Sequence, residues 1–497
     1  MHRAYFDNTT SSEGLHRRSL RSGAVSMMAQ ATSMVIQVVS TIVLARLLLP
    51  EDFGLIAMVA AITGFATIFV DLGTRDALAQ RDTVTEGEVS ALFWITVGVG
   101  LALTTATILG SRLIARFYAE PRLEHVAVAL SLTFVLPSLY YQQYALMRRA
   151  LLFQKLAAID VGANVLATAV AIFVAYRGYG YWALVAKLVL TPFFAGIGVW
   201  VTCGWYPGRP TFTTGVTNML KFGLNITGFT MADYVSRSVD RVALGYTTGP
   251  KDLGYYQNAF VVYDNPLTLF TVPLHGVAVS TLTKLRDNLP ELRRAWAMAL
   301  SSLVFFAAPS FALLAVTGQD LVVLLLGSKW AEAGVIVSIL ALRGPAHVVE
   351  RTLGWLHVAA GRADRWRHWG LVSCAVLLVA LFCGLPYGPI GVAASYTAFM
   401  YLLFAPAILY AGRPLGIGAR DLIQAVGPQL TVALGIAGLG LFLRHTIFVD
   451  LSPLVRLLVL TALCGGMYMT IMILGFRMTK PIVLAVSLLR RRHGSGA

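Results

Sequence analysis

Charged residues are scarce in this sequence: they make up 13% of its 497 residues, against 57% hydrophobic ones. Soluble domains carry about 25% charged residues. A chain this apolar cannot hide its hydrophobic surface in a water-soluble fold, so the composition excludes a soluble enzyme or binding module. Cysteine is also rare. The four cysteines show no paired ligand spacing, which argues against a disulfide framework or a zinc site.

Motifs of covalent chemistry and of nucleotide or metal binding are missing as well. The sequence has no His-Glu-x-x-His, P-loop, dinucleotide fingerprint or nucleophile elbow, so we predict no catalytic residue, cofactor or metal ion. The net charge of +15 is dispersed over short loops rather than gathered on one face, which argues against nucleic acid as a partner. A polysaccharide polymerase or a lipid-using glycosyltransferase is disfavoured too, because the longest external connection, near 317–334, is short and partly apolar.

Apolar runs fill almost the whole chain. A membrane-spanning helix needs about 20 mostly apolar residues, and windows of that length predict about fourteen spans. The predicted spans are 23–45, 53–73, 89–111, 124–146, 159–176, 180–202, 219–246, 254–281, 296–316, 335–357, 368–385, 390–410, 424–443 and 454–476. The expected fold is therefore an all-α polytopic membrane protein, with the lipid bilayer as its surroundings.

The basic residues divide unequally between the two sides of this predicted topology. About 24 Lys and Arg fall on the side of the termini and about 8 on the other, and the positive-inside rule then places both termini in the cytoplasm of a bacterial inner membrane protein. The predicted organisation is a cytoplasmic tail at 1–22, an N-lobe at 23–202, a cytoplasmic linker at 203–218, a C-lobe at 219–410, a C-terminal helix pair at 411–476 and a basic cytoplasmic tail at 477–497.

One turn motif recurs at an offset of 200 residues. The chain reads Pro-Glu-Asp-Phe-Gly at 50–54 and Pro-Lys-Asp-Leu-Gly at 250–254. Proline stops the incoming helix, aspartate can cap the next helix, and glycine permits close backbone approach. Because six predicted spans separate the copies, both turns fall on the same side of the membrane. The two lobes are therefore expected to be parallel six-helix repeats with the substrate site between them.

Several motifs resemble the oligosaccharide flippases of the polysaccharide-transport family, whose superfamily also holds multidrug exporters and the lipid II flippase. They are Leu-Ala-Arg-Leu-Leu-Leu-Pro-Glu-Asp-Phe-Gly at 44–54, Phe-Val-Asp-Leu-Gly at 69–73, Ala-Gln-Arg at 79–81, Asp-Arg at 240–241, Leu-Gly-Tyr-Tyr at 253–256, Leu-Gly-Ser-Lys-Trp at 326–330 and Glu-Ala at 332–333. The resemblance covers most of the chain, up to about the twelfth span.

The resemblance implies a fourteen-helix bundle that carries an undecaprenyl-diphosphate-linked oligosaccharide between the membrane leaflets by alternating access, for exopolysaccharide or lipopolysaccharide biosynthesis. A polysaccharide polymerase is a conceivable partner. The alternative is an ion-coupled exporter of small drugs from the sister family, which usually has twelve spans and fewer cationic residues in its cavity. The fourteen-span prediction favours the flippase.

Ionisable residues inside spans are costly, so they usually face a cavity or a partner. The seventh span carries a helical stripe formed by Asn225, Asp233, Arg237, Asp240 and Arg241. Asp233 and Arg237 lie four residues apart and could simply neutralise each other. The alternative is that Arg237 and Arg241 line a central cavity and attract anionic cargo, since a guanidinium donates two parallel bonds to phosphate.

The other spans supply further candidates for a cationic cavity. Arg343, His347 and Arg351 share one face of the tenth span, and Lys187 is the main isolated cation of the first lobe. Lys187 could instead extend to the membrane boundary. Polar or aromatic cavity candidates are Gln30, Gln37, Asn225, Tyr141 and His347. For the Tyr-Tyr-Gln-Gln-Tyr run at 140–144 an interfacial aromatic belt is favoured over stacking on sugars. Asp264 and Asp233 are the candidates for coupling to an ion gradient.

Overall fold

The computed structural model describes residues 12–71, 73–74, 78, 84–478 and 481. The description leaves out the side chains of 12–27, 29, 222, 225–226, 228–230, 232–233, 235–237, 272–273, 277 and 363. Every regular element among the described residues is a helix, which confirms the all-helical fold. The chain forms two compact units, an N-terminal unit at Met1–Gly254 and a C-terminal unit at Tyr255–Ala497.

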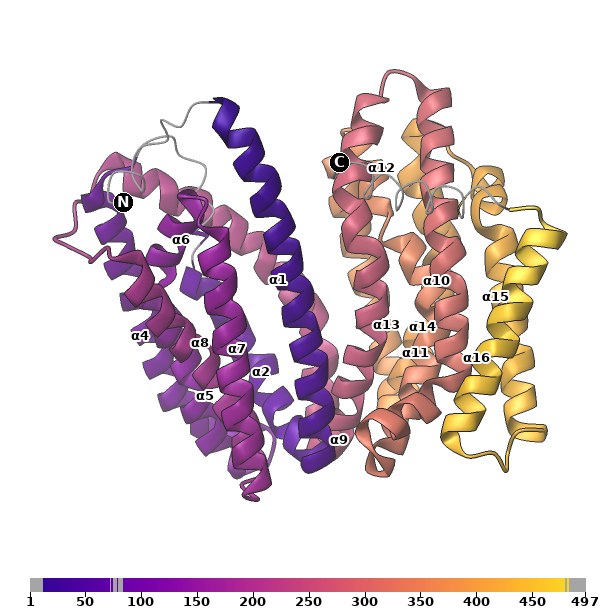
Figure 1. The fold of residues 1–497 in the computed structure, drawn as a ribbon, viewed down its shortest axis with the longest axis horizontal. Helices are drawn as coiled ribbons and strands as arrows, with labels where there is room; N and C mark the ends of the chain where they lie inside the picture. The colour runs from indigo at the N-terminus through magenta and orange to yellow at the C-terminus, as the bar shows by residue number, and fades with distance from the viewer. Residues whose placement is uncertain (1–11, 72, 75–77, 79–83, 479–480, 482–497) are drawn as a thin grey trace. The chain divides into compact units, whose positions relative to one another are not determined.

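The helices follow one another with short connections (Figure 1). Those of the N-terminal unit are α1 (Ser12–Leu47), α2 (Pro50–Asp71), α4 (Glu86–Phe117), α5 (Arg122–Ser138), α6 (Tyr141–Arg149), α7 (Phe153–Tyr176), α8 (Trp182–Cys203) and the first part of α9 (Thr214–Lys284). The C-terminal unit holds the rest of α9, then α10 (Leu289–Leu326), α11 (Ala331–Glu350), α12 (Leu353–Ala359), α13 (Ala363–Gly384), α14 (Gly388–Gly412), α15 (Ala419–Thr446) and α16 (Pro453–Thr470). Short turns of other helix types are η2 (Ser328–Trp330), η3 (Leu385–Tyr387), η4 (Arg413–Leu415) and η5 (Ile471–Gly475).

Twelve stretches of the described residues are long and apolar enough to cross a membrane, so the chain is a multi-pass membrane protein. The count is lower than the predicted fourteen because the stretch 238–284 contains one predicted span and only the end of the span before it, while the stretch 364–415 contains two. Helix α9 covers 71 residues and comprises two helices joined at a kink, each of them long enough to cross the hydrocarbon core. It bends at Gly249, where φ is 84°. The stretch 364–415 contains both α13 and α14, joined through η3.

Two predicted spans are interrupted in the structure. The fourth is divided into α5 and α6 at Leu139 and Tyr140, and Pro137 lies in the last turn of α5. Proline has no amide hydrogen to donate and disfavours an uninterrupted helix. At the break, the Leu139 carbonyl accepts a hydrogen bond from Trp200 Nε1 at 3.0 Å. The tenth span is divided into α11 and α12 at positions 351–352.

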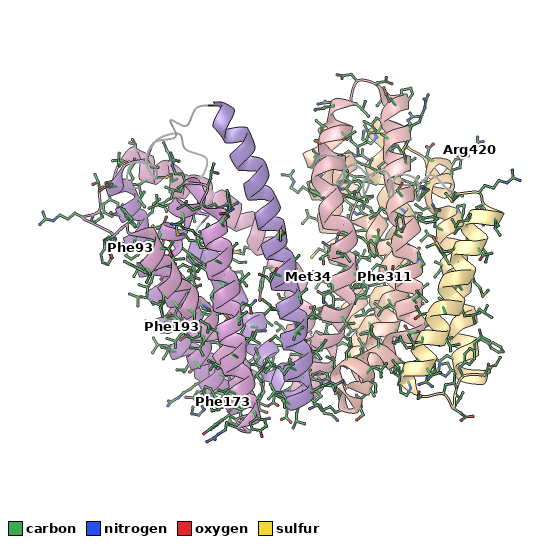
Figure 2. All side chains as sticks on the ribbon, in the orientation of Figure 1. Met34, Phe93, Phe173, Phe193, Phe311 and Arg420 are labelled. Carbon is green, nitrogen blue, oxygen red and sulfur yellow. The ribbon has the colours of Figure 1, made fainter. Side chains whose placement is uncertain are left out.

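In the N-terminal unit, helices pack side by side while large apolar side chains point outward. Helix α1 lies along α7, α7 packs on α8, and α4 packs on α5 (Figure 1). Phe173 and Phe193, labelled in Figure 2, are 61% and 43% exposed. Such exposure would be unfavourable in water, but it suits a surface whose solvent is lipid.

The first part of α9 packs within the N-terminal unit, although the predicted C-lobe begins at residue 219. Tyr234 on α9 donates a hydrogen bond to the Ala60 carbonyl of α2 at 2.7 Å. Gly64 leaves room for this ring, because a Cβ there would collide with the Tyr234 hydroxyl. The predicted domain boundaries stay a prediction.

Residues 204–213, inside the predicted linker, are not helical.

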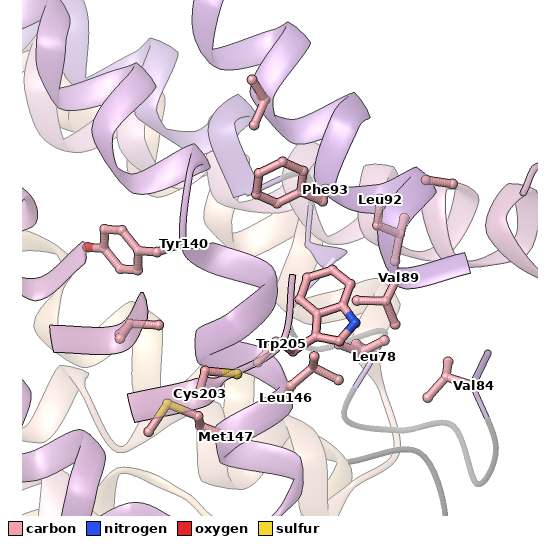
Figure 3. Packing of buried hydrophobic residues seen from close by; sticks show 14 of the residues in the cluster. Leu78, Val84, Val89, Leu92, Phe93, Tyr140, Leu146, Met147, Cys203 and Trp205 are labelled. Carbon is pink, nitrogen blue, oxygen red and sulfur yellow. The ribbon is translucent and has the colours of Figure 1, made fainter. Parts of the chain in front are cut away.

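An apolar cluster fixes one end of this non-helical segment. Trp205 is 2% exposed and packs in a cluster with Leu92, Leu146 and Cys203 (Figure 3). Its ring also meets Phe93 edge-on, with centroids 6.5 Å apart. A buried tryptophan contributes a large apolar area, so the segment is held against α4 and α6.

The C-terminal unit is built around α10, which packs on α11, α15 and α16. Most of its residues between Leu303 and Gly318 are buried. Phe311 is fully buried, and Gly344 on α11 lies against its ring without space for a side chain. Helix α10 is therefore the central element of this unit, and α11 can approach it closely.

Candidate functional site

The N-terminal unit contains a cavity of about 550 Å³ among α1, α2, α5, α7 and α8. Small-molecule sites typically measure about 300–1,000 Å³. Apolar residues such as Leu130, Pro137 and Leu188 form a large part of its lining, and the polar or aromatic members are Ser33, Thr63, Thr67, Thr133, Tyr140, Tyr141, Asp160, Asn164 and Thr191. Hydroxyl, amide and carboxylate groups beside two aromatic rings are the groups that bind carbohydrate, through hydrogen bonds and stacking. The cavity is thus chemically suited to a polar ligand.

Asp160 is the carboxylate of this cavity. It lies on α7, one helical turn before Asn164, so both side chains are on the same face. Tyr144 donates a hydrogen bond to Asp160 Oδ2 at 2.9 Å. The break between α5 and α6 places Tyr140 and Tyr141 against the cavity, while Gln142 turns inward. Gln142 Nε2 donates to Thr74 Oγ1 at 3.0 Å and to Thr96 Oγ1 at 3.2 Å.

Of the predicted cavity residues in this unit, only Tyr141 lines the described cavity. Gln30 and Gln37 are exposed on the face of α1 that also carries the lining residue Ser33. Lys187 is half-buried on α8, and its Nζ lies 2.6 Å from Ser40 Oγ, outside the cavity lining. Their roles stay predictions.

The charged stripe of the seventh span is described only in part. The side chains of Asn225, Asp233 and Arg237 lie outside the described residues. Arg241 is half-buried, and its backbone amide donates to Asp240 Oδ1 at 2.8 Å. The predicted substrate contact of Arg237 and the predicted coupling role of Asp233 therefore stay predictions.

In the C-terminal unit, the predicted stripe of the tenth span meets α9. The Tyr263 hydroxyl lies 2.7 Å from His347 Nδ1, and the two rings are stacked. Arg351 Nη2 lies 3.5 Å from Asp264 Oδ1. Both side chains of this pair are about one-third exposed, at 28% and 35%. The structure thus brings four predicted site residues, Arg343, His347, Arg351 and Asp264, into one region.

Arg343 is enclosed by aromatic rings and is only 4% exposed. Its guanidinium carbon lies 4.9 Å from the ring centroid of Tyr263, 5.9 Å from that of Phe260 and 5.7 Å from that of Tyr396. Cation–π contacts offset part of the cost of burying the charge. No carboxylate of the described residues lies within ion-pair distance of it, and its Nε has no hydrogen-bond partner there. Arg343 is therefore a buried cation without a neutralising anion in the described part of the chain.

Sequence reasoning missed the polar pair of the N-terminal cavity and the aromatic residues around Arg343. Asp160 and Asn164 could have been found, because they are a carboxylate and an amide four residues apart within the predicted span 159–176. No sequence pattern indicated the aromatic residues that surround Arg343. Phe260, Tyr263 and Tyr396 lie on α9 and α14, and aromatic residues are ordinary components of membrane helices.

Comparisons with known proteins agree with this architecture. Residues 43–335, more than half of the chain, match the family model described as "Polysaccharide biosynthesis protein". The teichuronic acid biosynthesis protein TuaB of Bacillus subtilis is 24% identical over 459 residues, which are 90% of this chain and 94% of TuaB. The lipopolysaccharide biosynthesis protein WzxC of Escherichia coli is 24% identical over 409 residues, 81% of this chain and 77% of WzxC.

Among solved structures, the lipid II flippase MurJ in an inward closed conformation has a similar fold. Its TM-score is 0.68 at 15% sequence identity, and the match covers 91% of this chain and 99% of MurJ. At this identity the likeness concerns the fold alone. The resemblance expected from the motifs at 44–54 and 253–256 is confirmed, and the chain belongs to the polysaccharide biosynthesis protein family.

Proposed function

We propose that this protein is a flippase that moves undecaprenyl-diphosphate-linked oligosaccharide repeat units across the bacterial inner membrane by alternating access. The product would serve exopolysaccharide or lipopolysaccharide biosynthesis. Family membership supports a membrane transport protein of polysaccharide biosynthesis. The relatives TuaB and WzxC, both named for the biosynthesis of a cell-surface polymer, support the same assignment.

The observation that carries the proposal is the polar cavity among the membrane helices of the N-terminal unit. Its volume of about 550 Å³ suits a small part of a glycan. Tyr140 and Tyr141 can stack on sugar rings, and Asp160 and Asn164 can bind sugar hydroxyls. A cavity that received only apolar drugs would have little use for so many hydroxyl, amide and carboxylate groups, because each must be desolvated when a drug binds.

The cationic residues account for the diphosphate. A diphosphate carries at least about two negative charges, and arginine binds phosphate through two parallel donors. Arg343 is the strongest candidate, since no carboxylate of the described residues neutralises it. Arg241, Arg351, Lys187 and Arg237 are the further candidates. Alternating access requires the buried Arg343 to become accessible in another conformation of the transport cycle.

A coupling ion would act at a carboxylate that can change its charge during the cycle. Asp264 is proposed for this role because its partner Arg351 is 3.5 Å away and both side chains are partly exposed. Asp160 is the second proposed site, as the carboxylate of the polar cavity, and Asp233 is the third.

The excess of basic residues on one side of the membrane supports the placement of both termini in the cytoplasm. A polysaccharide polymerase is the proposed partner, on the side of the membrane opposite to the termini.

The test is transport of a fluorescent undecaprenyl-diphosphate-linked glycan in proteoliposomes, read out by a membrane-impermeant quencher. The wild-type protein should increase the fraction of lipid that changes leaflet, and Asp160→Asn and Arg343→Gln should reduce it by at least about tenfold, as expected when a charged contact worth about 1.4 kcal/mol or more is lost. Arg112→Gln is the matched control, because Arg112 is 77% exposed and lies outside both regions.

A drug exporter predicts the opposite pattern in the same vesicles. Ethidium would move in an ion gradient, the glycan lipid would stay in its leaflet, and the proposal would have to be withdrawn. Equal glycan transport by wild type, Asp160→Asn and Arg343→Gln would leave the flippase but remove these two residues from its mechanism.

A further inference from the structure

The C-terminal helix pair α15 and α16 meets α10 at a second, smaller pocket. It has a volume of about 210 Å³ and is lined by Asp320, Gln319, Arg444, His445 and Arg456, among others. The pocket lies near the end of all three helices, since α10 ends at Leu326, α15 ends at Thr446 and α16 begins at Pro453. In a spanning helix these ends lie at the depth of the lipid headgroups.

The charges of this pocket do not balance. Arg456 Nη2 lies 2.6 Å from Asp320 Oδ1 and its Nε lies 3.1 Å from Oδ2, which is a two-point contact. Arg444 Nη2 lies 3.3 Å from the same carboxylate. Asp450, in the connection between α15 and α16, is exposed and lies outside ion-pair distance of either arginine. Two guanidiniums therefore share one carboxylate among the described residues.

The remaining contacts of the two arginines orient them without neutralising them. Arg444 Nη1 donates to the Val316 carbonyl at 2.6 Å, and Nη2 donates to Gln319 Oε1 at 2.9 Å. Arg456 Nη1 donates to the Val449 carbonyl at 3.2 Å. Arg444 is 6% exposed and Asp320 2%. The Arg456 side chain is 17% exposed, so a net positive charge is held in a largely buried cluster, which costs free energy unless an anion joins it.

The surroundings indicate which anion. The apolar rim of the pocket is formed by Val323, Val449 and Pro453, and Val449 is 53% exposed. A free anion would gain nothing from this apolar rim, whereas a lipid can place its headgroup in the pocket and its acyl chains along the rim. We propose that the pocket between α10, α15 and α16 binds the phosphate of an anionic phospholipid headgroup through Arg444 and Arg456.

This binding would attach the helix pair to α10 through the lipid as well as through Asp320. The inference does not depend on the flippase proposal, because it concerns the stability of the C-terminal unit in its bilayer. It also goes beyond an ordinary structural ion cluster, which would need no anion from the lipid.

Thermal unfolding of the full-length protein in detergent tests it. Phosphatidylglycerol should raise Tm by about 2–4 °C more than phosphatidylcholine does. Gln319→Glu places a carboxylate beside Arg444 Nη2 and supplies the missing negative charge. We expect this variant to have a higher Tm without lipid and to lose the extra rise from phosphatidylglycerol. Gln424→Glu is the matched control, because Gln424 is exposed on α15 far from the pocket, and it should keep the full response.

Val449→Glu is the second variant, and its exposed position leaves folding unaffected. It too should lose the phosphatidylglycerol response. The proposal is overturned if phosphatidylglycerol and phosphatidylcholine act alike on the wild type, or if both pocket variants respond in full. An equal rise from inorganic phosphate at the same concentration would overturn the lipid as the source of the anion.

Discussion

Gly54 lies directly against the backbone carbonyl of Pro250, so close that a Cβ on Gly54 would overlap it. The contact is reciprocal, because a Cβ on Gly254 would overlap the carbonyl of Pro50. The two copies of the Pro-x-Asp-apolar-Gly turn, 200 residues apart in the chain, therefore pack against each other. Glycine is required at both positions for close backbone approach rather than for a positive φ.

Gly54→Ala should destabilise the protein, because its new methyl group meets backbone atoms that cannot rotate away. Overpacking of this kind costs about 1–3 kcal/mol, and Gly254→Ala should behave alike. Gly98→Ala is the control, since a Cβ at Gly98 meets open space and alanine favours a helix. The measurement is Tm of the purified proteins. A Gly54→Ala protein as stable as the Gly98→Ala protein would show that the turns are not in contact in solution.

Arg343→Met should separate function from stability. Methionine fills a similar volume among Phe260, Tyr263 and Tyr396 without burying a charge, so Tm should equal or exceed that of the wild type. Transport of the lipid-linked glycan should fall by at least about tenfold, as for loss of a charged contact. A clear fall in Tm with transport intact would assign Arg343 a structural role instead.

Glu120 makes a pH-dependent contact in the connection between α4 and α5. Arg122 Nε and Nη2 donate to its two oxygens at 2.8 and 2.9 Å, and these hydrogen bonds lower the pKa of Glu120 below the ordinary value of 4.5. Arg122 also donates to Glu51 in the first turn of α2. The folded state thus favours the charged carboxylate, and the connection is fixed to α2.

A group with a lowered pKa stabilises the fold above its ordinary pKa, and this stabilisation is lost as the pH falls through the lowered pKa. Glu120→Gln should therefore reduce stability at pH 7 by less than about 1 kcal/mol, a small value because Arg122 is 42% exposed. The gap in Tm between the two proteins should narrow as the buffer is taken from pH 7 towards pH 3. A gap that is constant with pH would contradict the ionic origin.

The start of α4 offers a test of the linker. Thr85 and Glu88 form a capping box, in which Glu88 N donates to Thr85 Oγ1 at 3.3 Å and Thr85 N donates to Glu88 Oε2 at 3.1 Å. Thr213, at the end of the non-helical segment, donates to Glu88 Oε1 at 2.6 Å. The same carboxylate thus caps α4 and holds the linker.

Thr85→Ala should cost about 0.5–2 kcal/mol and Thr85→Ser much less, because serine keeps the capping oxygen. Glu88→Ala keeps the backbone amide that donates to Thr85 Oγ1, but it removes the carboxylate that accepts from Thr85 N and from Thr213. Proteolysis of the segment 204–213 is the readout specific to the linker. It should accelerate in Glu88→Ala and stay unchanged in Thr85→Ala, and equal rates in the two variants would rule out the anchoring role.

The sequence by itself determines where most of the membrane helices of this protein lie along the chain. In lipid every backbone amide must be satisfied within its own segment, so a run of about 20 apolar residues already implies a helix. The interruption of the fourth span was not anticipated, even though Pro137 is visible in the sequence, because proline is tolerated in many membrane helices. The repeated turn at 50–54 and 250–254 indicated two copies of one local structure, but the contact between them, seen at Gly54, was not predicted.

Other features depend on which helix faces meet. The stripe of Arg343, His347 and Arg351 was visible from its spacing, but its partners Tyr263 and Asp264 lie about 80 residues away and are set by the packing of α11 on α9. The polar cavity and the excess charge at Arg444 and Arg456 arise in the same way, from side chains of several helices. The hydrophobic effect does not select partners in lipid, since lipid tails are as apolar as leucine. Shape and polar contacts select them, and these exist only once the helices have packed.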